Sequence, residues 1–266
     1  VTSFKWSNLA SQNAGVTVVV IGLTSSLRKP CSLFSVDEQG QVLSRKVTNI
    51  SPYLFAGDNT VVRALSRPLG GRNKMIRGNM PNDGGFLVLH PDEADQMLSE
   101  FPGAERFVKK FVGSQEFIHS KLKFCLWIEN DELDDALDCG PVAKRIAQVR
   151  EKRLSGGKQA RDNADTPHRF VFAPHRPGVA IMVPRVSSEN RDFLPVGITN
   201  GDLVISERNF ALYDADLWNI ALIASRLHWV WIGTVCVRMR TDFSYSNTLG
   251  WNTFPVPTLT DKNKND

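Results

Sequence analysis

The stretch HWVWIGTVCVRMRTDFSYSNTLGWNTFPVP, residues 228–257, contains the clearest structural pattern in the chain. Between Arg238 and Tyr245, polar and apolar side chains alternate strictly, which is the period of a β-strand with one side facing water. The polar side chains on that side are Arg238, Arg240, Asp242 and Ser244. The sequence therefore predicts one continuous strand whose exposed side presents hydrogen-bond donors and an acceptor in a row.

The pair formed by Arg240 and Asp242 has two interpretations. An arginine and a carboxylate two positions apart can read one G·C base pair, because arginine donates twice to guanine O6 and N7 and the carboxylate accepts from cytosine N4. The alternative is an ordinary salt bridge on an exposed strand, which contributes little to stability. The alternation of side chains does not by itself decide between them.

Length and composition describe a folded protein. The chain has 266 residues, 23% of them charged and 42% hydrophobic, which is enough to bury a substantial core. No apolar run approaches the roughly 20 residues needed to cross a bilayer, and residues 1–6 lack a signal-peptide pattern. We therefore expect a cytoplasmic protein with no membrane partner.

Cysteine and histidine positions argue against a metal centre and against catalysis. The residues concerned are Cys31, Cys125, Cys139, Cys236, His90, His119, His168, His175 and His228. No CxxC pair or Cys/His cluster at zinc spacing occurs, and no histidine has an evident Ser or Cys nucleophile in its context. We expect buried reduced thiols, no metal, and no catalysis from this chain alone.

Charge is segregated in the middle of the chain, where acidic residues crowd positions 131–138 and basic residues follow at 144–161. Residues 141–154 predict a helix, and Ser155-Gly-Gly-Lys158 predicts a flexible basic loop. The apolar stripe of the helix consists of Val142, Ile146 and Val149. This basic segment could lie along a phosphate backbone or be a solvated helix face and linker. The arginines and lysine between residues 59 and 77 also have two interpretations, a phosphate-contacting loop or a solvated connection.

Periodicity and turn signals elsewhere predict a mixed α+β fold with antiparallel strands and packed helices. Predicted strands cover residues 16–23, 31–36, 41–47, 122–128, 170–172, 179–183, 193–196, 203–206 and 210–213. One predicted helix begins at Pro91, and three others cover residues 103–112, 141–154 and 218–227. The β-branched run at 16–23 predicts a buried strand, Asp37-Glu-Gln-Gly40 predicts a hairpin loop, and Asn82-Asp-Gly-Gly85 predicts a turn.

Short blocks of sequence carry a family resemblance over nearly the whole chain. They are NISPYL at 49–54, GNMPNDGG at 78–85, the segment from EFI at 116–118 to FCLWI at 124–128, VSSENR at 186–191, HWVW at 228–231, YS at 245–246 and WNTFPVP at 251–257. In these blocks the chain resembles the target recognition domain of MmeI-like proteins. These are type IIL restriction-modification enzymes that join a nuclease, an adenine methyltransferase and a recognition domain in one chain. The sequence departs from that pattern at Val237, where the family has Gly, and at Gly250-Trp251, where it has an aliphatic-Tyr pair.

The resemblance implies a division of the chain and a function. Residues 1–50 would be the terminal strands of a methyltransferase domain, 51–257 a DNA target recognition domain, and 258–266 a polar tail. The domain would read bases of double-stranded DNA in the major groove and would be non-catalytic in isolation. S-adenosylmethionine and Mg²⁺ would serve the parent enzyme, whose methyltransferase and nuclease domains would be the partners of this chain. The Gly-rich turn and Asn-Pro-Pro-aromatic loop of adenine methyltransferases do not occur in this sequence.

The resemblance also implies site residues. The positions that match the base-reading segment of the family are Arg240, Thr241, Asp242 and Ser244. With Arg first and Asp second, we expect guanine opposite Arg240 and its paired cytosine opposite Asp242. The expected phosphate contacts, drawn from the basic segment and from matching family positions, are Lys152, Arg153, Lys158, Arg161, Ser188, Arg191 and Tyr245. The block VSSENR has a second interpretation, a structural turn that orients the strands.

An alternative from another functional class is a protein-interaction or scaffold module that does not read DNA. Its anchors would be Trp218, Trp229 and Trp231, because tryptophan is enriched at the energetic centres of interfaces. Core packing accounts for most of these side chains more simply. A hydrolase is a third possibility, and no motif in the sequence favours it.

Overall fold

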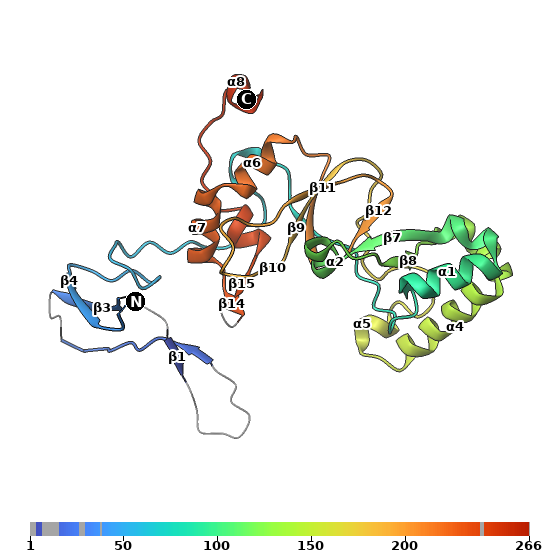
Figure 1. Cartoon of the computed structure of the whole chain (residues 1–266), viewed down its shortest axis with the longest axis horizontal. Helices are drawn as coiled ribbons and strands as arrows, with labels where there is room; N and C mark the ends of the chain where they lie inside the picture. Colours follow the sequence, from blue (N-terminus) through green and yellow to red (C-terminus); the bar gives the residue numbers. More distant parts are fainter. Residues whose placement is uncertain (1–3, 7–15, 27–29, 38, 240–241, 266) are drawn as a thin grey trace.

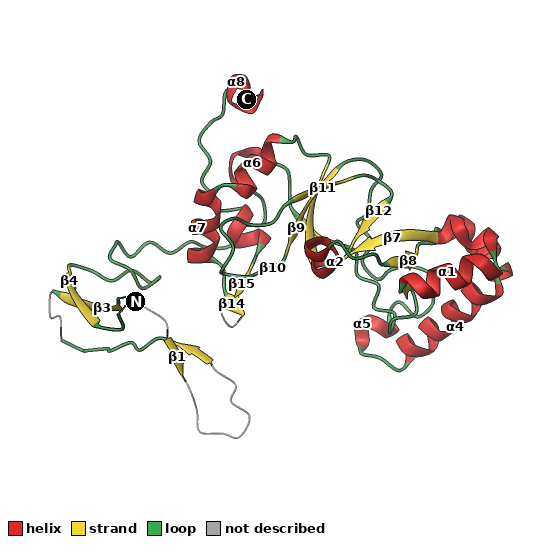
Figure 2. Ribbon diagram, in the orientation of Figure 1, coloured by secondary structure: helices red, strands yellow, loops and turns green. Residues whose placement is uncertain are grey.

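The computed structural model describes residues 4–6, 16–26, 30–37, 39–239 and 242–265. The molecule is elongated in Figure 1, with the amino-terminal strands at one end, a helix-rich lobe at the other, and a body that contains a sheet between them. Helices and strands are mixed along the chain (Figure 2). The predicted α+β class is therefore confirmed.

The helices are α1 (Pro91–Glu100), α2 (Ser114–His119), α3 (Leu133–Asp138), α4 (Gly140–Leu154), α5 (Lys158–Arg161), α6 (Trp218–Ala224), α7 (Arg226–Val235) and α8 (Asp261–Asn265). The strands are β1 (Phe4–Trp6), β2 (Val16–Val18), β3 (Cys31–Val36), β4 (Val42–Val47), β5 (Ile76–Arg77), β6 (Val88–Leu89), β7 (Val108–Val112), β8 (Phe124–Leu126), β9 (Ala180–Pro184), β10 (Val186–Ser187), β11 (Gly197–Thr199), β12 (Leu203–Ile205), β13 (Asn209–Tyr213), β14 (Arg238–Met239) and β15 (Asp242–Ser244). Short helical turns occur at η1 (Leu69–Gly71), η2 (Pro102–Phe107), η3 (Asn130–Glu132) and η4 (Asn247–Trp251).

The body is built on a four-stranded antiparallel sheet with the order β11-β9-β13-β5. Strands β9 and β13 are buried along their whole length, which explains why their sequences, apart from Asn209, are apolar without alternation. On one face, Ile181 and Leu212 belong to the same core as Ile232 of α7. On the other face, Met182 and Ala211 pack with Ile205 of β12. The sheet is therefore covered on both sides.

The helix-rich lobe contains a second sheet, with the order β12-β7-β8-β6, in which β12 runs parallel to β7. Helix α4 covers residues 140–154, against a predicted 141–154, and its predicted apolar stripe is confirmed. Val142, Ile146 and Val149 are buried in one core with Leu87 and Leu126. This core is distinct from that of the body.

The predicted single strand from Arg238 to Tyr245 is wrong. The chain instead forms two short strands, β14 and β15, which pair antiparallel with Met239 opposite Asp242 and Arg238 opposite Phe243. Strand β10 pairs with the other edge of β15 and completes a three-stranded sheet. Directly paired residues share a face of a sheet. Arg238 therefore lies on the side of Phe243, and Met239 on the side of Asp242.

At the amino-terminal end, the predicted hairpin is confirmed, because β3 pairs with β4 from Cys31–Val47 to Val36–Val42. The predicted buried strand over 16–23 is wrong. Strand β2 ends at Val18, and Val20, Ile21 and Leu23 are 74%, 59% and 93% exposed. The prediction of burial rested on the apolar composition of this segment alone.

Two predicted helices also differ. Residues 102–107 form the turn η2, and residues 108–112 form strand β7, although a helix was predicted over 103–112. The helix predicted over 218–227 is interrupted at Ser225, whose side chain accepts a hydrogen bond from the backbone N–H of His228 and caps α7. Helix α5 begins at Lys158, so the flexible loop predicted there is shorter than expected.

Several smaller predictions have mixed outcomes. The strands predicted at 122–128, 179–183, 203–206 and 210–213 correspond to β8, β9, β12 and β13. The strand predicted at 193–196 precedes β11, and 170–172 forms only a bridge between Phe172 and Met80. The turn at 82–85 is confirmed by positive φ angles at Asn82, Gly84 and Gly85. No helix among the described residues is long and apolar enough to pass through a lipid bilayer.

Candidate nucleic-acid interface

The β14–β15 hairpin projects from the body next to α7 (Figure 1). Its inner face is firmly packed. The ring of Phe243 meets that of Trp229 edge to face, with centroids 4.5 Å apart, and a side chain at Gly233 would lie only 3.0 Å from the Phe243 ring. The Arg238 guanidinium lies 4.3 Å from the same ring. The hairpin is thus held on a preformed aromatic base.

Arg238 also connects the hairpin to the segment after β10. Its Nη1 lies 2.8 Å from Oε2 of Glu189, forming an ion pair between two partly exposed side chains. Within the same segment, Ser188 accepts a hydrogen bond from the backbone N–H of Asn190, and Arg191 is exposed. These contacts favour the interpretation of VSSENR as a turn that orients the strands, and they place Ser188 and Arg191 beside the hairpin.

The outer face of the hairpin carries the described part of the predicted base-reading set. Asp242 and Ser244 are half-buried there, Met239 is 60% exposed opposite Asp242, and Val186 is opposite Ser244. Arg240 and Thr241 lie outside the described residues. In sequence they are the two residues between the paired positions Met239 and Asp242.

Tyr245, a predicted phosphate contact, is not available at the surface. Its side chain is 3% exposed, and its hydroxyl lies 3.0 Å from Nε2 of His228, which is completely buried. The Tyr245 ring also contacts Phe210 and leaves no room for a side chain at Gly250, whose added Cβ would lie 2.5 Å from it. Tyr245 therefore supports the end of β15 from below, and the prediction of a phosphate contact is wrong for this residue.

Burial gives His228 a pH dependence that can be measured. Loss of hydration, with a smaller effect of the nearby Arg72 charge, lowers the pKa of His228 to about 3. The unfolded chain would protonate this histidine near its ordinary pKa of about 6.5, so the free energy of unfolding should fall as pH drops from about 6.5, by up to about 1.4 kcal/mol per pH unit. Urea unfolding at pH 7, 6 and 5 should record this loss.

The matched control is His228→Gln, which keeps a polar partner for Tyr245 but does not titrate. Burial lowers the pKa values of His168 and His175 as well, so some pH dependence should remain in the variant. The difference between the two proteins isolates His228. Parallel stability curves for wild type and variant across this pH range would contradict the assignment.

Arg153, another predicted phosphate contact, is also buried, with 1% of its surface exposed. Its guanidinium donates to five backbone carbonyls. These belong to Pro81, Asn82, Asn163, Thr166 and Arg169, at 2.7 to 3.1 Å. All of its donating groups are occupied by the protein itself. The prediction of a phosphate contact is therefore wrong for Arg153, which joins the turn after β5 to the segment after α5.

The other predicted cations of this segment remain at the surface. Lys152 lies along Gly84, Lys158 pairs with Asp162 at 2.7 Å, and Arg161 donates to the carbonyl of Gly156. Lys152 and Lys158 line a groove with Asn82 and the glycines of the loop before α5. In Figure 1, α5 lies on the lower side of the helix-rich lobe, and strands β14 and β15 lie on the lower side of the body.

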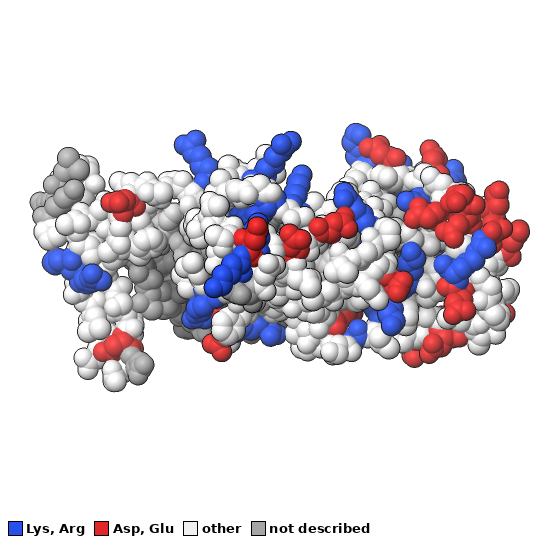
Figure 3. Space-filling view, turned by 90° about the horizontal axis from the view of Figure 1, so that it is seen from above, with Lys and Arg blue, Asp and Glu red and all other residues white. Residues whose placement is uncertain are grey.

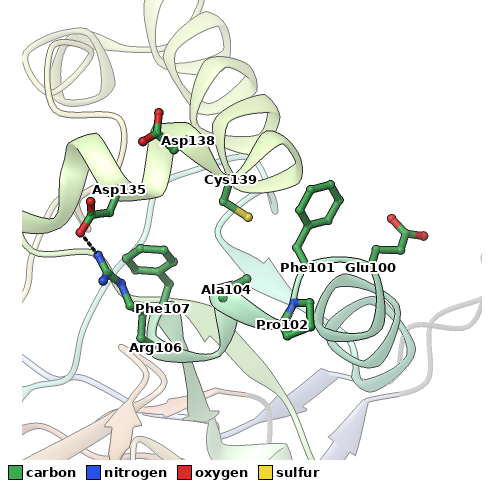
Figure 4. A pocket seen from close by; sticks show the side chains of 10 residues that line it. Glu100, Phe101, Pro102, Ala104, Arg106, Phe107, Asp135, Asp138 and Cys139 are labelled. Atoms are coloured by element: carbon green, nitrogen blue, oxygen red, sulfur yellow. Dashed lines mark hydrogen bonds and ion pairs between the residues drawn. The ribbon is translucent and has the colours of Figure 1, made fainter.

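The far end of the helix-rich lobe has the opposite charge. Figure 3, seen from above, has Asp and Glu side chains concentrated at that end. A pocket there, between α1, η2 and α3, is lined by Glu100, Asp135 and Asp138 (Figure 4). Arg106 forms an ion pair with Asp135 at its edge. This end would repel a polyanion, so an interface with nucleic acid is expected on the body and on the side of α5.

The tryptophans proposed as anchors of a protein-interaction surface are largely part of the core. Trp229 is 5% exposed and packs on Phe243. Trp218 and Trp231 are half-buried, with the Trp218 N–H donating to Asp216 and the Trp231 ring near that of Phe254. These side chains stabilise the body, which weakens the scaffold alternative.

A packed α+β body that presents a short hairpin, with surface cations on the same side, has the architecture of a nucleic-acid recognition module. The chain belongs to the family of MmeI target recognition domains, whose model matches residues 56–258. The resemblance found in the short sequence blocks is thereby confirmed.

Two relatives support the assignment. DNA methyltransferase A of Bacillus subtilis (strain 168) is 36% identical over 265 residues, which cover 99% of this chain and 30% of that protein. The structure of the type IIL restriction-modification enzyme MmeI in complex with DNA matches with a TM-score of 0.92 and 29% identity, over 99% of this chain and 35% of that one. The chain thus spans about a third of the length of these relatives.

Proposed function

We propose that this chain supplies sequence-specific recognition of double-stranded DNA to a larger restriction-modification methyltransferase, and that it reads bases in the major groove. The observation that carries the proposal is the β14–β15 hairpin, which is packed on Trp229 from below and presents Asp242 and Ser244 on its outer face. A major groove about 12 Å wide admits a two-stranded ribbon, whose strands lie about 4.8 Å apart. The recognition module itself performs no chemistry.

Within the proposal, the base-reading residues are Arg240, Thr241, Asp242 and Ser244. The phosphate contacts are Lys152, Lys158, Arg161, Ser188 and Arg191, now without Arg153 and Tyr245. The carboxylate of Asp242 would accept from a cytosine N4 amino group, and Arg240 would donate to the guanine of the same pair. The phosphate contacts would fix the position of the hairpin on the duplex without adding sequence information.

The parent polypeptide would be a cytoplasmic, S-adenosylmethionine-dependent, adenine-specific methyltransferase with a Mg²⁺-dependent nuclease domain. Among the described residues, the NISPYL block at 49–54 does not fit the methyl donor or its target adenine. In the NISPYL block, Asn49 donates to the Gly57 carbonyl and to Asn59, and the Tyr53 hydroxyl accepts from the N–H of Val62. These side chains serve the local fold, so we assign the cofactors to the other domains of the parent.

Residues 1–50 would complete the methyltransferase domain. Their exposed apolar side chains favour this view, since Leu23, Phe34 and Val42 are 93%, 57% and 68% exposed. Phe34 and Val42 line an apolar hollow together with Ile21 and Leu54. Contiguous exposed apolar surface usually marks a contact with another protein surface. The neighbouring domain of the same polypeptide is the proposed contact.

The expected result of Arg240→Ala is a loss of preference at one G·C base pair of the recognition site. Loss of a bidentate arginine contact costs about 1 to 3 kcal/mol at the base pair concerned. Selection from a randomised duplex library at low salt would give the wild-type consensus. The same selection with the variant should return that consensus with one position relaxed.

Asp242→Asn should relax the same base pair, because both residues are proposed to read its two bases. Lys158→Ala is the control, since loss of a phosphate contact should weaken binding evenly across sequences. An even loss with Arg240→Ala would make Arg240 a phosphate contact. Absence of binding at every salt concentration, with the full parent chain, would remove the DNA assignment and favour the protein-interaction module.

A further inference from the structure

Three arginines from separate stretches of sequence meet at one end of the central sheet. Strand β13 is paired with β5 on one side, where Arg77 lies opposite Phe210, and with β9 on the other, where Pro184 lies opposite Asn209. Immediately beyond β9, the backbone N–H of Arg185 donates to the carbonyl of Arg208 at 3.0 Å. The three side chains therefore start from neighbouring backbone positions.

The three arginines also lie close together at this end of the sheet. Arg77 shares a face with Phe210 because the two are directly paired, whereas Arg208 lies in the turn before β13, near enough to Arg185 for its charge to lower the pKa of that side chain. Arg185 reaches that face as well, because its guanidinium lies 5.5 Å from the centre of the Phe210 ring. Arg77 and Arg208 are exposed, and Arg185 is half-buried between the elements that carry them.

Positive charge in this cluster is only partly neutralised. Burial lowers the pKa of Arg185, and the charges of Arg77 and Arg208 lower it further. Glu207 offsets part of the charge, because its Oε1 lies 3.6 Å from Nε of Arg208. Arg185 Nη1 donates to the Glu207 carbonyl, whereas its buried Nε has no partner among the described residues. Three cations facing one carboxylate form a site suited to an anion.

The cluster is physically connected to the proposed reading hairpin. The carbonyl of Arg185 accepts a hydrogen bond from the backbone N–H of Tyr245 at 2.7 Å, and the Tyr245 ring contacts Phe210. Tyr245 is three residues from Asp242 along the strand, a distance of about 10 Å at the usual rise per residue. An anion held by the cluster would therefore lie close to a base pair contacted by Asp242.

We propose that Arg77, Arg185 and Arg208 form a phosphate-binding cluster that holds the DNA backbone beside the base pair read by the hairpin. This inference rests on the proposed function. Guanidinium groups bind phosphate oxygens through paired, charge-assisted hydrogen bonds. The cluster contributes affinity and register but no sequence preference, because phosphates are alike at every base pair.

The test is the salt dependence of DNA binding by Arg77→Gln/Arg208→Gln in the full parent chain. Each phosphate contact contributes about 0.9 to the slope of log K against log salt, so the slope should decrease by about 2. Affinity should fall evenly for the selected consensus and for scrambled duplexes. Arg185 is left in place because its backbone and side chain hold Tyr245 and Glu207.

The control is Arg106→Gln/Lys262→Gln, which removes the same charge from the acidic lobe and the carboxyl-terminal tail and should leave the slope unchanged. Arg77→Lys/Arg208→Lys should restore most of the slope, since lysine also binds phosphate as a point charge. If Arg77→Gln/Arg208→Gln left the slope unchanged, the phosphate-binding role of the cluster would be rejected. A change in the consensus sequence selected by this variant would reject it as well. Wild-type protein that binds no DNA at any salt concentration would instead reject the proposed function itself.

Discussion

Arg153→Ala is expected to destabilise the helix-rich lobe by roughly 3 to 5 kcal/mol, because removal of a buried charged partner leaves its former partners without hydrogen bonds. Five backbone carbonyls depend on this one guanidinium, and they come from two segments that have no regular structure of their own at those points. Chemical unfolding followed by circular dichroism measures the change directly.

Lys152→Ala is the matched control for this prediction. The two residues are neighbours on α4 and both are cationic, but Lys152 is exposed and should cost less than about 0.5 kcal/mol when replaced. Arg153→Lys should recover only part of the stability, since one ammonium group cannot reach all five carbonyls. If Arg153→Ala were as stable as Lys152→Ala and instead reduced the salt slope of DNA binding by about 1, Arg153 would be the phosphate contact that the sequence predicted.

The contrast between Lys152 and Arg153 illustrates what a basic stretch of sequence leaves open. The segment correctly predicts helix α4 and its buried stripe, because Val142, Ile146 and Val149 repeat at helical spacing. Which cation turns inward depends on carbonyls supplied by residues 81–82 and 163–169. Those partners come from outside the helix, and local periodicity carries no information about them.

The hairpin is a second case in which local pattern is insufficient. Alternation with a period of two continues unchanged through a reversal of the chain, and the residues between the strands, Arg240 and Thr241, include no Gly, Asn or Pro to signal a turn. The candidate base contacts Arg240, Thr241, Asp242 and Ser244 remain predictions from the sequence. The predicted polar face is only partly kept, because the pairing places Arg238 on the side of Phe243 and not on the side of Asp242.

Other misses have equally local causes. Phe107 and Phe111 are four residues apart, which imitates a helical face, although the chain changes from η2 to strand β7 between them. The cluster of Arg77, Arg185 and Arg208 has no signal in any single segment. Pairing between strands more than 100 residues apart in sequence brings Arg77 to the other two. Such sites become visible only after the sheet topology is known.

Trp251→Ala is expected to cost the body roughly 3 to 5 kcal/mol, the usual range for removal of a buried tryptophan. Trp251 is completely buried, its ring N–H donates to the Asn73 carbonyl at 2.9 Å, and the Arg72 guanidinium lies 4.3 Å from its ring. Arg72 in turn donates to the carbonyls of Trp251 and Phe254. The indole therefore connects the segment before β5 to residues 251–254.

The loss should also reach the hairpin, because Trp251 lies against His228, which holds the Tyr245 hydroxyl beneath the end of β15. Trp251→Phe is the control, since it keeps most of the apolar volume and loses the N–H bond to Asn73, and it should cost less than Trp251→Ala. We expect DNA selection with folded Trp251→Ala at low temperature to return a less sharply defined base pair opposite Asp242. If Trp251→Ala were as stable as the wild type, the stability of the body would not depend on this side chain. If the variant were destabilised but still selected a sharp consensus, the hairpin would keep its geometry without Trp251.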